Sequence, residues 1–399
     1  MATSTAPTDA PAPTDAPAAT TSTRLLSLDA FRGITIVGMI LVNNPGTWGA
    51  VYPPLLHADW HGWTPTDLIF PFFLFIVGVA ITFAYQKRLA QGVPKGPLVA
   101  KALRRAAILF GLGLVLATYP FVTFDPFGLR DFGSMRIMGV LQRIAVCYLV
   151  VSLLVLYTTP RTQAVVAGAL LLGYWAAMML VPVPGYGPGL IDDKVGNLAA
   201  YLDRLLLDGH LWRGADGLWD PEGLFSTLPA IGTTLFGVWA GRILRRPTVP
   251  LETTTRLLVY GMALVCVGYA WAWVFPINKP IWTSSYAVFT AGQAFCALGV
   301  CYWLTDVRGH RRWAQPFVAY GINAITVFVL SGLLARTLYL IKVPTADGGT
   351  TSLQAWFYQT VLAPLGPPRF TSLLYALLWI GAWYVVLAWM RRRNLVLKV

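Results

Sequence analysis

The sequence predicts an all-α, polytopic integral membrane protein with about ten transmembrane helices. Two features of the composition indicate this class: 56% of the 399 residues are hydrophobic and only 12% are charged, whereas ordinary soluble domains carry about a quarter charged residues. The third observation is that long stretches without Asp, Glu, Lys or Arg recur along the chain. Each can supply the roughly 20 apolar residues that a helix needs to cross a bilayer.

Ten uncharged windows mark the expected membrane-spanning helices. In chain order they are Gly33–Ala58, Leu68–Gln86, Ala106–Phe124, Ile144–Pro160, Thr162–Ile191, Gly223–Gly241, Leu257–Asn278, Pro280–Thr305, Trp313–Ala335 and Phe370–Met390. The fourth window is short, so we expect Met135–Gln142 to belong to the same helix. Gly348–Pro368 is uncharged too, but Gly, Pro and Gln interrupt it, and it is expected to lie at the membrane interface.

The basic residues predict the orientation, because cytoplasmic loops retain Lys and Arg. Basic clusters follow the second, sixth, eighth and tenth windows, which places both termini in the cytoplasm. The net charge of +13 is then a consequence of topology, and no separate basic face remains for nucleic acid. The expected setting is the cell inner membrane, with the lipid bilayer as a partner of the multi-pass chain.

The chain divides into a tail and one membrane domain. Residues 1–23 contain the imperfect repeat APTDAPAPTDAPA and are predicted to be a disordered Ala/Thr/Pro-rich cytoplasmic tail. This tail lacks the basic segment and short apolar core of a signal peptide, so the first span is expected to be retained. Residues 24–399 form the transmembrane domain. Its acidic extracytoplasmic loop, residues 183–222, is expected to contain a short amphipathic helix, Leu198–Leu207.

The first outer loop carries His57 and His61 just before a predicted helix start, T-P-T-D at residues 64–67. Thr64 is the expected N-cap, and Asp67 is the acidic residue that completes the cap. Capping is favoured over catalysis as the role of Asp67. The positive end of this helix favours a neutral imidazole nearby, which is the form a general base requires. A purely structural role for a histidine here is the alternative.

No metal site is expected. The spacing of His57 and His61 would suit a metal on a helix, but no third ligand accompanies them, and Trp60 and Gly62 suggest a turn. The four cysteines lie in apolar windows without metal-ligand spacing and are expected to be packing residues.

Two arginines, Arg136 and Arg143, are seven residues apart and are expected to share one face of the fourth span. A cation inside a bilayer is costly, so it usually faces a water-filled cavity or an anionic partner. Arg143 is therefore either a ligand-binding residue or half of a structural ion pair with an acid such as Glu222. Both explanations stay open at this point.

Other polar residues gather near the outer ends of the windows. Asp220 and Glu222 precede the sixth span, and Asn278 and Lys279 lie at the outer end of the seventh. One acid is explained by helix capping, but two acids with an amide and a lysine indicate a polar chamber. Amides in apolar helices need partners, which packing or a substrate would supply. The asparagines in question are Asn43, Asn44 and Asn323.

Several motifs give the chain a resemblance to a known family. They are SLDAFRG (Ser27–Gly33), LVNN (Leu41–Asn44), LLHADWHGWTPTDLIFPFFLFIVG (Leu55–Gly78), GVLQRIA (Gly139–Ala145), DPEGLFSTLPAI (Asp220–Ile231), PINKPIWTSSY (Pro276–Tyr286) and YGINAI (Tyr320–Ile325). These motifs occur in the same order as in the heparan-α-glucosaminide N-acetyltransferase family of membrane acyltransferases. The chain resembles this family from about Arg24 onward.

The resemblance implies a multispanning enzyme that takes an acetyl group from cytosolic acetyl-CoA and delivers it to an amino sugar or glycan across the membrane. The family's essential histidine falls on His57, the arginine of its D-x-F-R-G motif on Arg32, and the asparagine of its V-N motif on Asn43. His61 stands where the animal enzymes have Asn, and the loop between Asn43 and His57 is a few residues longer than theirs. The acceptor sugar is therefore left open.

Roles follow from this expectation. His57 would act as the general base and Asn43 would stabilise the developing oxyanion, with an acetyl-histidine intermediate as the other possibility. The candidates for binding the CoA phosphates are Arg32, Arg136 and Arg143. The candidates for binding substrate are Asp67, Asp220, Glu222, Asn278 and Lys279.

Two other classes compete with the enzyme. A secondary transporter of a small polar or anionic solute also has Gly/Pro interruptions and intramembrane charges, but the chain has no evident inverted repeat. A structural membrane subunit ranks third, because His57, Asn43, Asp67 and Glu222 gather toward the outside. A homodimer is the oligomer we consider, although nothing in the sequence fixes it.

Overall fold

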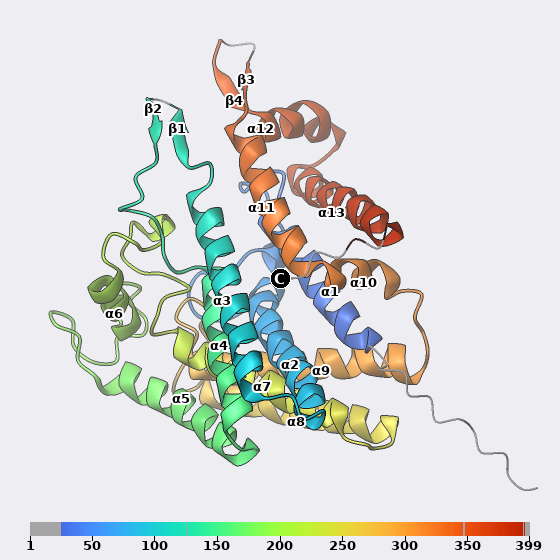
Figure 1. Cartoon of the computed structure of the whole chain (residues 1–399). Coiled ribbons are helices and arrows are strands. Elements are labelled where there is room, and N and C mark those ends of the chain that lie inside the picture. The colour runs from blue at the N-terminus through green and yellow to red at the C-terminus, as the bar shows by residue number, and fades with distance from the viewer. Residues whose placement is uncertain (1–24, 125, 346–347, 394, 396–399) are drawn as a thin grey trace, which may run out of the picture.

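The computed structural model describes residues 25–124, 126–345, 348–393 and 395, so the predicted tail, residues 1–23, lies outside the described residues. Helices make up most of the described chain (Figure 1). They are α1 (Leu26–Asn43), α2 (Ile69–Ala90), α3 (Lys95–Thr118), α4 (Val140–Tyr157), α5 (Pro160–Leu180), α6 (Leu198–Leu207), α7 (Thr227–Arg245), α8 (Pro250–Trp271), α9 (Ser284–Tyr302), α10 (Gln315–Ile322), α11 (Ala324–Leu340), α12 (Leu353–Phe357) and α13 (Pro368–Arg392). The all-α class is confirmed.

The β structure of the described residues is limited to two antiparallel hairpins. In the first, β1 (Val122–Phe124) pairs with β2 (Phe127–Leu129), and in the second, β3 (Lys342–Pro344) pairs with β4 (Thr350–Ser352). The first hairpin follows α3 and the second follows α11, and both lie at the same end of these helices (Figure 1). At this end, a hydrogen bond of 2.7 Å between the hydroxyls of Tyr119 and Thr337 joins the end of α3 to α11.

Within the described residues, seven helices are long and apolar enough to cross a membrane. They are α1, α2 with its preceding turn, α4, α5, α8, α9 with its following turn, and α13; α10 and α11 make an eighth if the bent pair is one span. Helices α3 and α7 lie on the third and sixth predicted windows but are not among these seven. A multi-pass membrane protein is thus indicated. The count of ten spans and the cytoplasmic termini stay predictions.

Several windows extend beyond the helices that they contain; α3 ends at Thr118 and α5 at Leu180, before their windows end. The first helix ends at Asn43, and the rest of its window, residues 44–58, is loop apart from a 3₁₀ turn at Pro53–Leu55. The fourth helix begins only at Val140, because Gly139 is fully extended and the preceding segment is bonded elsewhere. There the N–H of Ile137 donates to the carbonyl of His210 at 3.1 Å. The expectation that Met135–Gln142 continues this helix therefore fails.

The ninth window is also not a single straight helix. Helices α10 and α11 meet at Asn323 with a bend of 80°. Helix α10 packs directly on the backbone of α1, since a Cβ on Gly33 would lie 1.7 Å from the carbonyl oxygen of Phe317, and one on Gly321 would lie 2.0 Å from that of Asp29. Such close approach through small residues is typical of membrane helices. After the bend, α11 runs beside α3 instead (Figure 1).

The segment of residues 183–222 contains the predicted amphipathic helix. Helix α6 covers Leu198–Leu207, and Asn197 caps it by accepting a hydrogen bond from the N–H of Ala200 at 3.0 Å. Gly348–Pro368, expected not to span, contains short helical pieces and the whole of β4, and its last residue begins α13. The helix at Leu198–Leu207 is confirmed, because it depends on local pattern rather than on distant contacts. The interfacial position of Gly348–Pro368 stays a prediction.

Candidate active site

A cavity of about 490 Å³ brings together residues from widely separated parts of the chain. Its wall includes six residues that the sequence analysis had singled out: Asn43, His57, Asp67, Arg136, Glu222 and Lys279. The remaining wall is largely apolar and is supplied by α1, α2, α4 and α11, for example by Met39, Phe73, Ile144 and Phe328. The cavity is therefore a mostly apolar space with a polar group of side chains on its loop side.

His57 and Asp67 form a pair in this wall. The Nδ1 atom of His57 lies 2.6 Å from Oδ1 of Asp67. The histidine side chain is 50% exposed, whereas that of Asp67 is only 1% exposed. Because a carboxylate only accepts hydrogen bonds, the proton of a neutral imidazole is on Nδ1, and Nε2 keeps its lone pair. This tautomer is the one that a general base needs.

The carboxylate of Asp67 is itself held in place by the backbone. Its Oδ2 accepts hydrogen bonds from the N–H groups of Ala58 and Thr64, each at 3.0 Å. Residues Thr64 and Asp67 also form the predicted capping box at the 3₁₀ turn Pro65–Leu68, which leads into α2. Asp67 therefore caps a helix with one carboxylate oxygen and contacts His57 with the other. The capping role is confirmed, and the catalytic role stays a prediction.

Lys279 is the third member of this group and comes from the loop between α8 and α9. Its Nζ lies 3.0 Å from Nδ1 and 3.1 Å from Nε2 of His57, and 3.7 Å from Oδ1 of Asp67. Burial lowers the pKa of Lys279, while the carboxylates of Asp67 and Glu222 oppose that change. Nζ is thus almost equidistant from the two ring nitrogens of His57.

Arg136, which also lines the cavity, is bound by two carboxylates. It donates to both oxygens of Asp220, at 2.8 and 2.5 Å, and to Oε2 of Glu222 at 2.5 Å. Burial alone would disfavour the charge of Arg136, but these ion pairs raise its pKa above the ordinary value. Asp220 and Glu222 therefore share one guanidinium. Asp220 does not itself line the cavity but holds Arg136 there.

Asp203 supports this acidic segment and was missed by the sequence analysis. It lies on α6, is almost fully buried, and accepts a hydrogen bond from the N–H of Leu224 at 2.8 Å. Burial raises the pKa of Asp203 to about 7. A Cβ on Gly223 would lie 1.7 Å from Oδ2 of Asp203, so only glycine fits there. A single Asp in an amphipathic helix looks like part of its solvated face, so no signal in the sequence marked this residue.

The other predicted site residues lie outside the cavity wall. Arg32 donates to the carbonyl of Gly321 at 3.1 Å, and its Nη1 lies 3.5 Å from Oδ1 of Asp29. Arg32 itself is one helical turn before Thr35, which does line the cavity. Asn278 is fully buried and shapes its loop by accepting a hydrogen bond from the N–H of Ile281 at 3.0 Å.

Arg143 is fully buried in α4 and does not share a helix face with Arg136, because the segment that carries Arg136 is not helical. It donates to the carbonyl of Gly223 at 3.0 Å and to the hydroxyl of Ser226, and its guanidinium lies 5.2 Å from the ring centre of Trp282. Its contacts hold the segment that follows Glu222, rather than pairing with that carboxylate.

We expect Arg143→Gln to reduce thermal stability, because each charge-assisted hydrogen bond lost contributes about 1.5–3 kcal/mol. The folded fraction should bind acetyl-CoA as the unchanged protein does, which can be measured by thermal melting and by equilibrium binding in detergent. Arg104→Gln, at an exposed arginine, is the matched control. A selective loss of acetyl-CoA affinity without a change in melting would instead support the ligand-binding explanation.

His57 and His61 have separate surroundings. Nε2 of His61 lies 2.7 Å from Oδ1 of Asp192, which is 87% exposed, and Nδ1 lies 3.3 Å from the amide of Asn278. Gly62 has a positive φ of 93°, so the pair does lie on a turn. Of the two histidines, His57 alone lines the cavity. Among the described residues, no three His, Cys, Asp or Glu side chains come together as metal ligands would.

These observations define a multi-pass helical membrane protein with a histidine–aspartate–lysine group in the wall of a mostly apolar cavity. A family model described as "Heparan-alpha-glucosaminide N-acetyltransferase, catalytic" matches residues 24–269. The chain belongs to the heparan-α-glucosaminide N-acetyltransferase family, as its motifs indicated. The matched range contains Asn43, His57 and Glu222 but not Lys279.

Two curated relatives carry the name heparan-alpha-glucosaminide N-acetyltransferase. The protein from Homo sapiens is 32% identical over 356 residues, which cover 77% of this chain and 52% of the relative. The protein from Mus musculus is 30% identical over 358 residues, which cover 77% of this chain and 53% of the relative. The chain thus spans about half the length of the curated relatives it matches.

Proposed function

We propose that the protein is a transmembrane acetyltransferase that moves an acetyl group from cytosolic acetyl-CoA to an amino sugar or glycan on the extracytoplasmic side. The observation that carries this proposal is the His57–Asp67 pair in the wall of a mostly apolar cavity. Family membership supports the same activity, since the relatives are named as N-acetyltransferases.

The donor would occupy the apolar part of the cavity. The pantetheine arm of acetyl-CoA is long and largely uncharged, which suits a wall of residues such as Met39, Ile144 and Phe328. Thr35 marks the end of this wall nearest to Arg32, so Arg32 is our candidate for contacting the CoA phosphates. Arg136 is engaged by two carboxylates and Arg143 lies outside the wall, which makes both weaker candidates.

The transfer would proceed at the His57 side. The acceptor nitrogen attacks the thioester carbonyl carbon as Nε2 of His57 takes its proton, so an N–C bond forms and the C–S bond breaks. The leaving CoA thiolate then receives that proton from His57. Asn43 and the ammonium of Lys279 would stabilise the oxyanion of the tetrahedral intermediate. Attack by His57 itself, giving an acetyl-histidine intermediate, uses the same groups in two steps.

The acceptor amine would be drawn to the acidic side of the cavity. Asp220 and Glu222 carry two negative charges against the single charge of Arg136, and Glu222 lines the cavity. An ammonium group arriving there would be attracted by the excess negative charge. It must then lose one proton to become nucleophilic. These contacts favour an amino sugar over a neutral hydroxyl acceptor.

A transporter of a small polar or anionic solute is the second candidate, and the 80° bend between α10 and α11 is the observation that favours it. Broken helices beside a cavity are common in transporters. Family membership favours the enzyme, because the relatives are named as N-acetyltransferases.

The proposal is tested in sealed proteoliposomes of defined orientation. Labelled acetyl-CoA is supplied on the side of the chain termini, and a panel of amino sugars on the other. We expect labelled N-acetyl sugar to form across the membrane and not when both substrates are on the outer side. Accumulation of an unmodified solute, with no acetylated product from any amino sugar, would favour the transporter and contradict the proposal.

A further inference from the structure

Lys279 places a primary amine in the wall of the first cavity, beside the proposed base. Its side chain is 17% exposed, and its Nζ lies 3.0 Å from Nδ1 and 3.1 Å from Nε2 of His57. A general base must lie within about 2.6–3.2 Å of the atom whose proton it removes. Nζ is therefore at the distance from Nε2 that the proposed reaction requires of the acceptor nitrogen.

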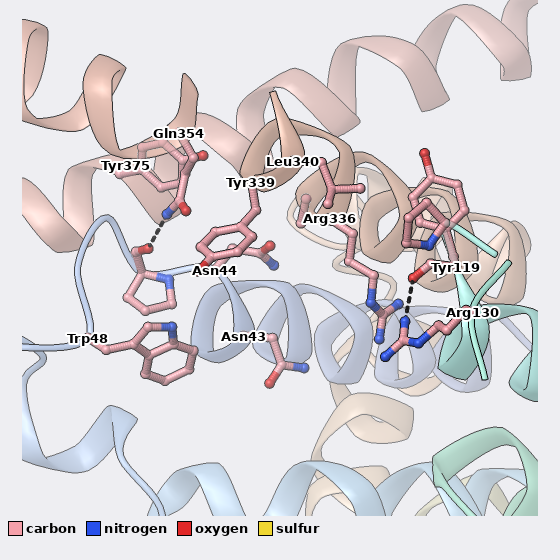
Figure 2. Close-up of a pocket in the computed structure, with 13 residues that line it drawn as sticks. Asn43, Asn44, Trp48, Tyr119, Arg130, Arg336, Tyr339, Leu340, Gln354 and Tyr375 are labelled. Atoms are coloured by element: carbon pink, nitrogen blue, oxygen red, sulfur yellow. Dashed lines mark hydrogen bonds between the residues drawn. The ribbon is translucent and has the colours of Figure 1, made fainter. Parts of the chain in front are cut away.

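The neighbouring cavities are lined by arginines rather than by lysines. A second cavity of about 360 Å³ shares Asn43 with the first, and a third of about 320 Å³ shares Arg136 with it. The basic side chains of the second cavity are Arg130 and Arg336 (Figure 2). Guanidinium groups stay protonated, so they do not act as nucleophiles. Among the described residues that line the three cavities, Lys279 is the only lysine.

Lys279 can also supply the uncharged amine that acylation requires. Besides His57, the charged groups that act on it are Asp67, Glu222 and Arg143. Burial lowers the pKa of Lys279 and Arg143 acts in the same direction, whereas the two carboxylates oppose this change. With a lowered pKa, the neutral fraction exceeds that of an ordinary lysine and grows as the pH rises. Desolvated lysines of this kind serve as nucleophiles in enzymes.

The proposed donor would be bound close to this amine. In the proposed reaction the thioester carbonyl lies between Asn43, which stabilises the oxyanion, and His57, which takes the proton. Lys279 contacts the same His57. When no acceptor is bound, the amine of Lys279 therefore lies beside both the base and the thioester.

We propose that Lys279 is a site of self-acetylation, at which the protein transfers the acetyl group of acetyl-CoA to its own Nζ in the absence of an acceptor. The inference rests on the proposed function, because it uses the same donor and the same base. Neutral Nζ attacks the thioester carbonyl carbon as Nε2 of His57 takes one proton, so an N–C bond forms and the C–S bond breaks. That proton passes to the leaving thiolate, which gives free CoA and an uncharged amide on Lys279.

This modification would slow further acetyl transfer. An amide is far less reactive than a thioester, so the acetyl group on Lys279 is not passed on to a sugar. Acetylation also removes the positive charge that would stabilise the oxyanion in the proposed reaction. A bound acceptor prevents the modification by occupying the place beside His57. Self-acetylation would thus couple the activity of the protein to the supply of acceptor.

The test incubates the full chain in detergent with labelled acetyl-CoA and no acceptor, and locates the label by peptide mass spectrometry. Lys194 is the matched control, because its Nζ also lies near an aspartate, 3.4 Å from Oδ1 of Asp59, but it lines none of the three cavities. We expect Lys279 to be labelled about a hundredfold faster than Lys194, a factor within the range that a general base contributes. His57→Ala should abolish most of this difference.

The rate of sugar acetylation gives a second readout. Preincubation with acetyl-CoA alone should lower the initial rate with glucosamine in step with the label on Lys279. Glucosamine present from the start should slow the labelling. Lys279→Arg keeps the positive charge but cannot be acetylated, so its own initial rate should not fall during preincubation.

Equal labelling of Lys194 and Lys279, or labelling of Lys279 that is unchanged in His57→Ala, would indicate chemical acetylation and overturn the inference. Acetylated glucosamine without label on Lys279 would overturn it too, and would leave the proposed function intact. Label on Lys279 that depends on His57, without product from any amino sugar, would uphold the site and reject the sugar as acceptor. If His57→Ala does not fold, glucosamine decides: label that it fails to slow while it is itself acetylated contradicts the inference.

Discussion

His57→Ala is expected to abolish acetyl transfer while leaving acetyl-CoA binding nearly unchanged. His57 is half-exposed in the cavity wall, and Asp67 fixes the tautomer that leaves Nε2 free to take a proton. A general base contributes about 10²–10⁴-fold to the rate and little to ground-state binding. The measurement is the steady-state rate with labelled acetyl-CoA, together with equilibrium binding of the donor to the same preparation.

His61→Asn is the matched control for this change. His61 belongs to the same loop and also pairs with an aspartate, but it does not line the cavity. Turnover should therefore survive His61→Asn, which restores the residue of the animal enzymes. Substantial turnover by His57→Ala, or loss of turnover in the His61 variant, would show that the base has been assigned to the wrong histidine.

Asp67→Asn is expected to reduce the rate by a similar factor, although it changes only one atom. The Oδ2 atom of Asp67 accepts the N–H groups of Ala58 and Thr64, so the amide oxygen of the substituted side chain would take that position to keep both hydrogen bonds. The amide nitrogen would then face Nδ1 of His57 and force the ring to accept there. The proton would move to Nε2, and the imidazole could no longer act as a base toward the acceptor.

Two further variants separate this effect from a loss of folding. Asp192→Asn makes the same change in the other histidine–aspartate pair and should leave turnover intact, because His61 lies outside the cavity wall. The double variant His57→Ala, Asp67→Asn should be no slower than His57→Ala alone, since both single changes remove one function. Additive losses would mean that Asp67 acts independently of His57, for example through helix capping alone.

Much of the site could be predicted from the sequence, because its residues lie beside short sequence patterns that determine local structure. The cap at residues 64–67 and the amphipathic helix Leu198–Leu207 are set by short-range pattern, and both occur where expected. Six of the ten predicted site residues line one cavity, although their roles there stay predictions. Arg136 was misplaced on a helix, because an apolar run carries no sign that Gly139 is extended.

What the sequence determined by itself is the class of the protein and its family. Uncharged runs of sufficient length can satisfy their backbone in lipid only as helices, so composition alone indicates a helical membrane protein. The motif order assigns the family, and the comparisons agree. Neither conclusion required knowledge of which helices touch.

Only the tertiary structure decided the site. Lys279 reaches His57 across 222 positions of sequence, and Arg136 reaches Glu222 across 86. The bend at Asn323 carries α11 toward α3. Such pairings depend on how helices pack through close contacts like that of Gly321 with the backbone of α1. Helical periodicity repeats every few residues, so it describes faces of single helices and carries no information about which faces meet.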